Sequence, residues 1–368
     1  LVTKLYGNSA GKLTSLLVFI KTLPMTYAMG LGILLNTVFA IPYSIAVAIG
    51  LAFTCSYSFL GGLRAIVFSD LVQFGLMLIG IASVLVFSFT QYGGMDFLLA
   101  NLPDSHLSPC SNYSIVNTLV WLFIAISTTL INPTFYQRCL AAKTTKTAQY
   151  GIILSILVWI LFDIGITVSG LYAKAALPNH PVNTAYLSYI FSVMPSGVKG
   201  LLVASIAATT LSTLDSFLFI CSNTLSYDLK LIARKSSTGR QHKLAFLLSA
   251  ILTLCFALYF KGDFENAWRT IKGSFSACLL VPIAIGYMWP RLFTERDFLK
   301  CIISGAISML AYWVVVQHYP VPFDPFYVGF FATVIFSLTV YCNQYGIIFR
   351  NIFNMLRRHR QASVSKLS

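Results

Sequence analysis

The stretch YGIILSILVWILFDIGITVSGLYA, residues 150–173, decides the fold class of this chain. It is almost wholly apolar, and Asp163 is its one charged residue. A helix needs about 20 apolar residues to cross the roughly 30 Å hydrocarbon core of a bilayer. Because lipid offers the backbone no hydrogen-bond partners, a run of this length predicts a transmembrane helix.

Similar apolar runs fill most of the remaining chain. The predicted spans are Leu13–Phe39, Ser44–Leu60, Leu71–Phe89, Val116–Leu130, Tyr150–Ala173, Gly200–Leu225, Ala245–Phe260, Ser274–Trp289, Cys301–Val316 and Phe326–Phe349. The composition agrees, because 57% of the residues are hydrophobic and 10% are charged, with a mean hydropathy of +0.78. We therefore expect an all-α integral membrane protein with about ten transmembrane helices, and a soluble globular domain is excluded.

The distribution of positive charge predicts how these spans are oriented. Most of the 25 Lys and Arg residues fall in loops on the same predicted side as the N-terminus. Under the positive-inside rule, both termini of this multi-pass protein then lie in the cytoplasm, which indicates the plasma (inner) membrane. The net charge of +14 is spread over these short loops. It indicates contact with anionic lipid rather than a nucleic-acid partner.

Hydroxyl side chains gather on one face of a predicted span. Thr209, Ser212, Thr213 and Ser216 recur at three- and four-residue spacing, and Asp215 lies at the edge of their face. Such a cluster either joins two helices through its hydroxyls or offers the oxygen ligands that hard cations prefer. A packing face needs no carboxylate, so Asp215 favours a cation site.

A second carboxylate, Asp70, lies at the start of the predicted span Leu71–Phe89. A charged group at membrane depth is costly, so it needs a partner or belongs to an ion pathway. Asp70 is therefore either an interfacial residue paired with Arg64 or a member of a cation pathway.

One predicted span ends in a polar, proline-interrupted segment. Ser127, Thr128 and Thr129 precede Asn132 and Pro133, and proline breaks or kinks a helix. Interrupted helices of this kind form substrate sites in transporters, so the four polar residues are candidate substrate ligands. The alternative is a plain span that simply ends at the proline.

Three motifs occur in order along the chain. They are Gly61-Gly62-Leu63-Arg64-Ala65 with Asp70-Leu71-Val72-Gln73, then Tyr136-Gln137-Arg138 with Ala141-Ala142-Lys143, then Leu211-Ser212-Thr213-Leu214-Asp215-Ser216. Together they resemble the sodium:solute symporter family, which includes proline, pantothenate, choline and sodium–glucose carriers.

The resemblance implies a five-plus-five inverted-repeat core, similar to the leucine-transporter fold, in a single membrane domain. Residues 13–89 would form the remainder of the first repeat, 116–289 the second repeat, 301–349 two extra C-terminal helices, and 350–368 a cytoplasmic tail. Core helices one and two have no counterpart in this chain. We therefore expect it to be truncated at its N-terminus relative to the family.

The resemblance also implies which residues hold the coupling ion. Ser212 and Thr213 would supply hydroxyls and Thr209 a carbonyl to sodium, and the rest of the ligands would come from core helix one. Asp70 would lie toward the cytoplasmic exit of the cation, with Asp215 on the same pathway. Sodium is the only metal implied, and no cofactor is expected.

The leading hypothesis is sodium-coupled import of a small organic solute by alternating access. Two alternatives stay open: a non-functional truncated remnant of such a carrier, and a transporter-like sensor. Coupling to protons through Asp70 or Asp215 also stays open, and the sequence indicates no oligomeric state. An enzyme is not expected, because the chain has no metal-ligand cluster, nucleophile elbow or phosphate loop.

Overall fold

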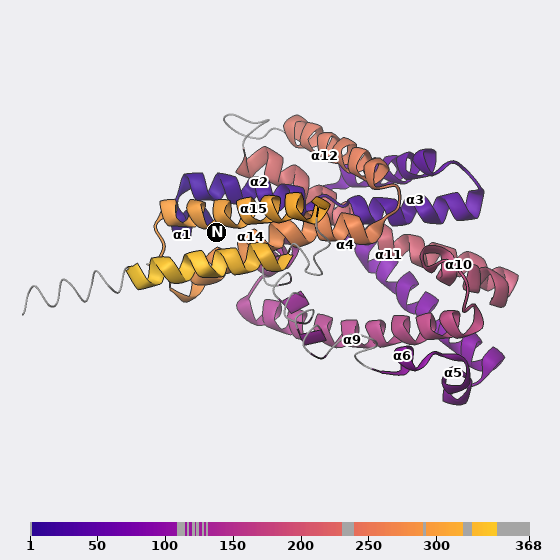
Figure 1. Ribbon diagram of the computed structural model, residues 1–368. Coiled ribbons are helices and arrows are strands. Elements are labelled where there is room, and N and C mark those ends of the chain that lie inside the picture. Colours follow the sequence, from indigo (N-terminus) through magenta and orange to yellow (C-terminus); the bar gives the residue numbers. More distant parts are fainter. Residues whose placement is uncertain are drawn as a thin grey trace, which may run out of the picture. The chain divides into compact units, whose positions relative to one another are not determined.

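Helices make up every regular element in the described part of the chain (Figure 1). The computed structural model describes residues 2–108, 115, 118–119, 122, 125–126, 129, 132–229, 239–289, 292–318 and 326–343. Within these ranges there is no β-strand. The prediction of an all-α protein is therefore confirmed.

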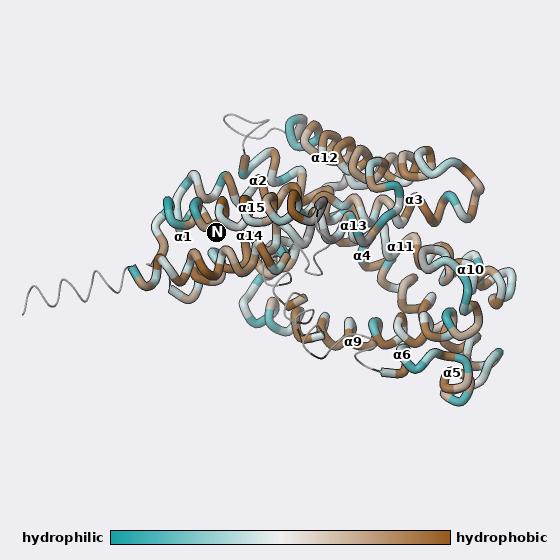
Figure 2. The backbone as a smooth tube through the Cα atoms, viewed as in Figure 1, coloured by the Kyte–Doolittle hydropathy of each residue, from teal (hydrophilic) through white to brown (hydrophobic). Residues whose placement is uncertain are grey.

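The apolar helices overlap most of the predicted spans, but the predicted span Leu13–Phe39 is two helices separated at Leu23 and Pro24. Among the described residues, seven helical stretches are long and apolar enough to cross a bilayer: Asn8–Phe39, Gly62–Tyr92, Thr145–Ala176, Ser196–Asp228, Gln241–Phe260, Glu295–Val315 and Phe326–Asn343. The shorter apolar helices Tyr43–Ser58 and Ser274–Met288 correspond to two further predicted spans. Most of Val116–Leu130 lies outside the described residues. Figure 2 shows hydrophobic residues along most of the length of these helices.

The chain divides into two compact units. One comprises Leu1–Lys21 with Glu265–Ser368, and the other comprises Thr22–Phe264. Helices of the first unit are α1 (Val2–Tyr6), α2 (Asn8–Thr22), η2 (Trp268–Gly273), α14 (Ser274–Met288) and α15 (Glu295–His318), with a further helix over Phe326–Asn343. α13 (Phe264–Ala267) lies at the boundary between the units.

Contacts between its two chain segments hold the first unit together. The Tyr6 hydroxyl donates a 2.7 Å hydrogen bond to the carbonyl of Pro282 in α14. Glu295 accepts from the backbone N–H groups of Ser9 and Ala10, at 2.7 and 3.1 Å. These N–H groups belong to the first turn of α2 and have no partner inside their own helix, so the carboxylate acts as its cap.

The second unit contains the candidate site. Its helices are α3 (Met25–Phe39), α4 (Tyr43–Tyr92), α5 (Met95–Asn101), α6 (Asp104–Leu107), α8 (Pro133–Ala141), α9 (Thr145–Ala176), α10 (Val182–Val193), α11 (Ser196–Asn223), the π-helix η1 (Thr224–Asp228) and α12 (Gly239–Phe260). α11 packs against α3, α4 and α12, and α4 also contacts α3 and α9. α11 is therefore a central element of this unit.

Helix α4 is bent at Gly62, where the backbone takes φ 59° and ψ −155°. This conformation is essentially restricted to glycine, because a Cβ atom would strain it. The short connection predicted between Ser44–Leu60 and Leu71–Phe89 is thus a sharp change of direction inside one helical element. The bend sets the direction from which the second half of α4 approaches α11.

α9 shows how apolar surface is distributed in this unit. Only 6% of its most apolar window is buried. Its C-terminal turns pack into a core that includes Val84, Tyr172, Tyr189 and Leu202. A helix that is apolar around most of its circumference is stable against lipid or further protein, as expected for a membrane span.

Candidate functional site

Glycines on two neighbouring helices let α11 approach closely. A Cβ atom on Gly80 of α4 would collide with the side chain of Ser205, and one on Gly30 of α3 would lie 3.4 Å from the Thr210 side chain. Small residues at these positions allow close packing of helix backbones in membranes. The two contacts fix which face of α11 meets α3 and which meets α4.

The three predicted sodium ligands form what we call the hydroxyl turn: Thr209, Ser212 and Thr213. All three are half-buried. The Thr209 hydroxyl donates to the carbonyl of Ser205 at 2.9 Å, and the Thr213 hydroxyl donates to the carbonyl of Thr209 at 3.5 Å. These bonds stay within α11, so they do not tie the hydroxyl turn to a neighbouring helix.

Asp215 and Ser216, which we call the acid turn, are both buried. One oxygen of Asp215, Oδ2, accepts from the Tyr57 hydroxyl at 2.8 Å and from the Ser69 hydroxyl at 3.4 Å. Tyr57 and Ser69 lie on opposite sides of the bend in α4. In a straight helix, residues this far apart are separated by about 18 Å. The bend at Gly62 therefore helps both to reach one carboxylate.

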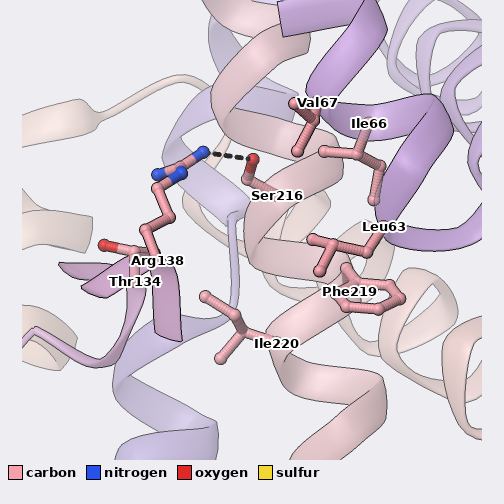
Figure 3. Close-up of a pocket in the computed structure, with 8 residues that line it drawn as sticks. All are labelled: Leu63, Ile66, Val67, Thr134, Arg138, Ser216, Phe219 and Ile220. Carbon is pink, nitrogen blue, oxygen red and sulfur yellow. Dashed lines mark hydrogen bonds between the residues drawn. The ribbon is translucent and has the colours of Figure 1, made fainter. Parts of the chain in front are cut away.

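Arg138 of α8 joins the same cluster. Its Nη2 lies 3.1 Å from Oδ2 of Asp70 and 3.2 Å from the Ser216 hydroxyl. The alternative partner considered for Asp70, Arg64, is therefore not the one found: the ion pair forms with a helix distant in sequence. Figure 3 shows the guanidinium reaching toward Ser216.

Several oxygens in this cluster are buried without a hydrogen-bond donor. They are Oδ1 of Asp70 and Oε1 of Gln73, and Oδ1 of Asp215 receives no hydrogen bond from a side chain. With both aspartates ionised, two negative charges face one guanidinium, so the cluster has an excess of one negative charge. Unpaired oxygen acceptors and uncompensated negative charge both favour a cation nearby.

A small pocket lies beside Arg138 and Ser216, between α4, α8 and α11 (Figure 3). It is lined by Leu63, Ile66, Val67, Thr134, Arg138, Ser216, Phe219 and Ile220. Most of this lining is apolar. A low-dielectric wall strengthens electrostatic interactions of the neighbouring charges.

The predicted substrate residues are only partly described. Asn132 caps α8, because its side-chain oxygen accepts from the Thr134 backbone N–H at 3.1 Å and from its hydroxyl at 2.7 Å. Thr129 donates to the carbonyl of Ala125 at 2.9 Å and is exposed. Ser127 and Thr128 lie outside the described residues. α8 begins at Pro133, which fits both an interrupted helix and a span that ends at the proline.

Sequence reasoning missed the partners of the carboxylates. Tyr57 and Ser69 carry no signal, since an isolated tyrosine or serine in a membrane helix is common. Arg138 belongs to a motif, but its target could not be read from spacing along the chain. Gln73 shares a helix face with Asp70, three residues earlier, and that spacing was the one available indication.

The profile of the sodium:solute symporter family matches residues 9–305. The chain is 24% identical to the sodium/pantothenate symporter of Haemophilus influenzae over 271 residues, which cover 70% of this chain and 56% of that protein. It is 26% identical to the sodium-coupled monocarboxylate transporter 2 of Bos taurus over 300 residues, 72% of this chain and 47% of the relative.

A further relative and a solved structure are also similar to this chain. In an alignment 369 positions long, the chain is 23% identical to the sodium/glucose cotransporter of Vibrio parahaemolyticus. The alignment covers 89% of this chain and 66% of that protein. The solved structure of a Na⁺-coupled sialic acid symporter in a substrate-bound outward-open state superposes with a TM-score of 0.71. It covers 92% of this chain and 75% of that one at 17% identity, so the likeness concerns the fold. The chain spans 56% and 62% of the length of two sodium/pantothenate symporters that it matches.

Proposed function

The chain belongs to the sodium:solute symporter family, and from this premise we propose that it serves sodium-coupled import of a small organic solute. In such a carrier, sodium stabilises the state that binds solute, and both are released on the other side of the membrane. A membrane potential of 100 mV adds about 2.3 kcal/mol for each positive charge that enters. The observation that carries the proposal is the half-buried hydroxyl turn next to a cluster of two carboxylates and one guanidinium.

The sodium ligands are proposed to be the Ser212 and Thr213 hydroxyls and the Thr209 carbonyl. Hard cations prefer oxygen ligands, and these groups follow one another at helical spacing on α11. The hydroxyl turn is half-buried, and its hydrogen bonds stay within α11. Its hydroxyl oxygens can therefore still accept an ion while they donate to backbone carbonyls.

Asp70 and Asp215 are proposed to form the cation pathway from this site. Each has a second carboxylate oxygen that no side chain satisfies. The Asp70 side chain is 24% exposed, whereas Asp215 is fully buried, so the pair extends from the interior toward the surface. Family membership favours sodium over a proton as the ion on this path.

The solute and the location of the protein are proposed from the same family relationship. The relatives carry sodium with pantothenate, proline, glucose or monocarboxylates by name, so the solute class is a small organic molecule. Ser127, Thr128, Thr129 and Asn132 are proposed to contact it. From the positive loops and the positive-inside rule, we propose that both ends of the chain lie in the cytoplasm and that the protein resides in the plasma membrane. The five-plus-five repeat arrangement is part of this proposal.

Direct sodium binding tests the site without knowledge of the solute. We expect Ser212→Ala and Thr213→Ala, made in the complete gene product, each to weaken ²²Na⁺ binding about tenfold, because each removes one ion ligand. Thr210→Val is the matched control on the same helix: its hydroxyl bonds to its own helix, at the carbonyls of Ile206 and Ala207. Unchanged affinity in both alanine variants would exclude the site.

A further inference from the structure

We use the name acid cluster for Asp70, Asp215, Ser216 and the Arg138 guanidinium beside them. We propose that Arg138 is a built-in cation that occupies one of two monovalent-cation positions in the acid cluster, and so limits that cluster to one bound ion. The inference rests on the proposed function, because it concerns the ions that the carrier takes up. It adds a role for a residue that is neither a sodium ligand nor a pathway carboxylate.

The first step is the position of the guanidinium. One nitrogen of Arg138, Nη2, lies 3.1 Å from Asp70 of α4 and 3.2 Å from the Ser216 hydroxyl of α11. Carboxylate and hydroxyl oxygens are also what an alkali ion would use. The guanidinium therefore holds a place between α4 and α11 that suits a small cation.

The second step is the count of charge. When both are ionised, Asp70 and Asp215 contribute two negative charges, and Arg138 cancels one of them. One further monovalent cation then makes the cluster neutral, whereas a second would leave an uncompensated positive charge beside the fully buried Asp215, which is disfavoured. Arg138 thus sets the number of ions that the cluster accepts.

The third step is the set of oxygens that Arg138 would release. Without its side chain, both oxygens of Asp70 and the Ser216 hydroxyl would lack a donor, since Arg138 bonds to Oδ2 of Asp70 and to Ser216 and Oδ1 of Asp70 already has no donor. These groups come from one turn of α4 and one of α11. Together with an added negative charge, they make a vacant cation position.

The fourth step is that the ion pair between Arg138 and Asp70 can be removed without unfolding the protein. The Arg138 side chain is 56% exposed and that of Asp70 is 24% exposed. Pairs in contact with water contribute little net stability. We therefore expect Arg138→Gln to remain folded and its effect to appear in the ions that bind.

The test counts ²²Na⁺ ions bound per molecule of the purified complete protein at saturation, with N-methyl-D-glucamine keeping the ionic strength constant. We expect Arg138→Gln to bind one more equivalent than the natural protein. Arg138→Lys keeps the charge and should restore the natural count. Arg138→Gln with Asp70→Asn removes one charge of each sign and should also restore it.

A second measurement keeps the inference testable if Arg138→Gln does not fold. Asp70→Asn alone makes the cluster neutral in the presence of Arg138, and we expect it to weaken ²²Na⁺ binding at least tenfold. An unchanged or lower ion count in a folded Arg138→Gln protein overturns the inference, as does unchanged affinity in Asp70→Asn. If the natural protein binds no ²²Na⁺, the proposed function itself fails, and the two failures are thereby distinguished.

Discussion

The hydroxyl turn and the acid turn are neighbours on α11, yet they are held in different ways. Thr209 and Thr213 donate to carbonyls of their own helix, and the hydroxyl turn is half-buried. Asp215 and Ser216 are buried and bond to side chains from α4 and α8. One turn keeps oxygens available to a ligand, and the other is fixed by tertiary contacts.

This difference suits the two tasks that we propose for one helix. A binding turn must be able to release its ion, so it cannot depend on strong contacts with other helices. A charged turn at membrane depth must be compensated, because an isolated carboxylate there is costly. The position of α11 against α3, α4 and α12 lets both conditions hold within a few residues.

The largest expected effect comes from removing the charge of the acid turn. Asp215 lies three residues after Ser212, at a distance of about 5–6 Å along the helix surface. With an effective dielectric constant of about 20, a unit charge at that distance contributes about 3 kcal/mol. We expect Asp215→Asn to weaken ²²Na⁺ binding by up to about a hundredfold in equilibrium measurements.

Asp228→Asn is the matched control for that experiment. Asp228 lies at the end of η1, which continues α11, and its side chain is exposed. A charge in contact with water is well screened, so this variant should bind sodium as the natural protein does. Equal losses of sodium affinity in the two variants would mean that the removal of any negative charge weakens binding. The distinction between the two turns would then be wrong.

The next effect concerns stability. Tyr57→Phe deletes the donor of the 2.8 Å hydrogen bond to Asp215, and a hydrogen bond to a charged group contributes about 1.5–3 kcal/mol. Thr210→Val deletes a hydroxyl that bonds only within α11, and we expect it to cost about 0.6 kcal/mol or less. Thermal unfolding in detergent measures both. If Tyr57→Phe is no more destabilising than Thr210→Val, tertiary bonding does not distinguish the acid turn.

The smallest expected effect acts on the backbone of α4. A Cβ atom at Gly62 would meet nothing within 4 Å, but the residue has a positive φ of 59°. Gly62→Ala should therefore cost about 1–2 kcal/mol through backbone strain alone. Gly75→Ala, at a helical position of α4 with equally open surroundings, should stabilise the protein by up to about 1 kcal/mol.

The sign of these two changes is the informative result, again from thermal unfolding in detergent. Opposite signs indicate that the bend at Gly62 is required to bring Tyr57 and Ser69 to Asp215. Two stabilising substitutions would show that α4 can straighten without loss, and the account of how the acid turn is held would be wrong.

Much of the fold could be predicted, because a membrane helix is recognised from a local property, a long run of apolar residues. The apolar run over Tyr150–Ala173 lies within the observed helix Thr145–Ala176. The bend of α4 at Gly62 could not be predicted, because a pair of glycines is compatible with a loop, a helix or a kink.

The candidate site could likewise be predicted only in part. Helical periodicity placed Thr209, Ser212, Thr213 and Ser216 on one face, and the two carboxylates were recognised by their cost in lipid. The periodicity gave no information on which helix would meet that face. Only the structure showed that Oδ1 of Asp70 and Oε1 of Gln73 are buried without a hydrogen-bond donor.

By itself, the sequence determined that this chain crosses a membrane as helices, that the hydroxyl residues and Asp215 share one of them, and that three motifs of a sodium symporter occur in order. Only the tertiary structure decided that Asp70 pairs with Arg138 and not with Arg64, and that Tyr57 and Ser69 hold Asp215. The physical reason is the distance along the chain over which each property acts. Hydropathy and helical spacing act over a few neighbouring residues, whereas the partner of a buried charge is chosen by how distant helices bend and pack.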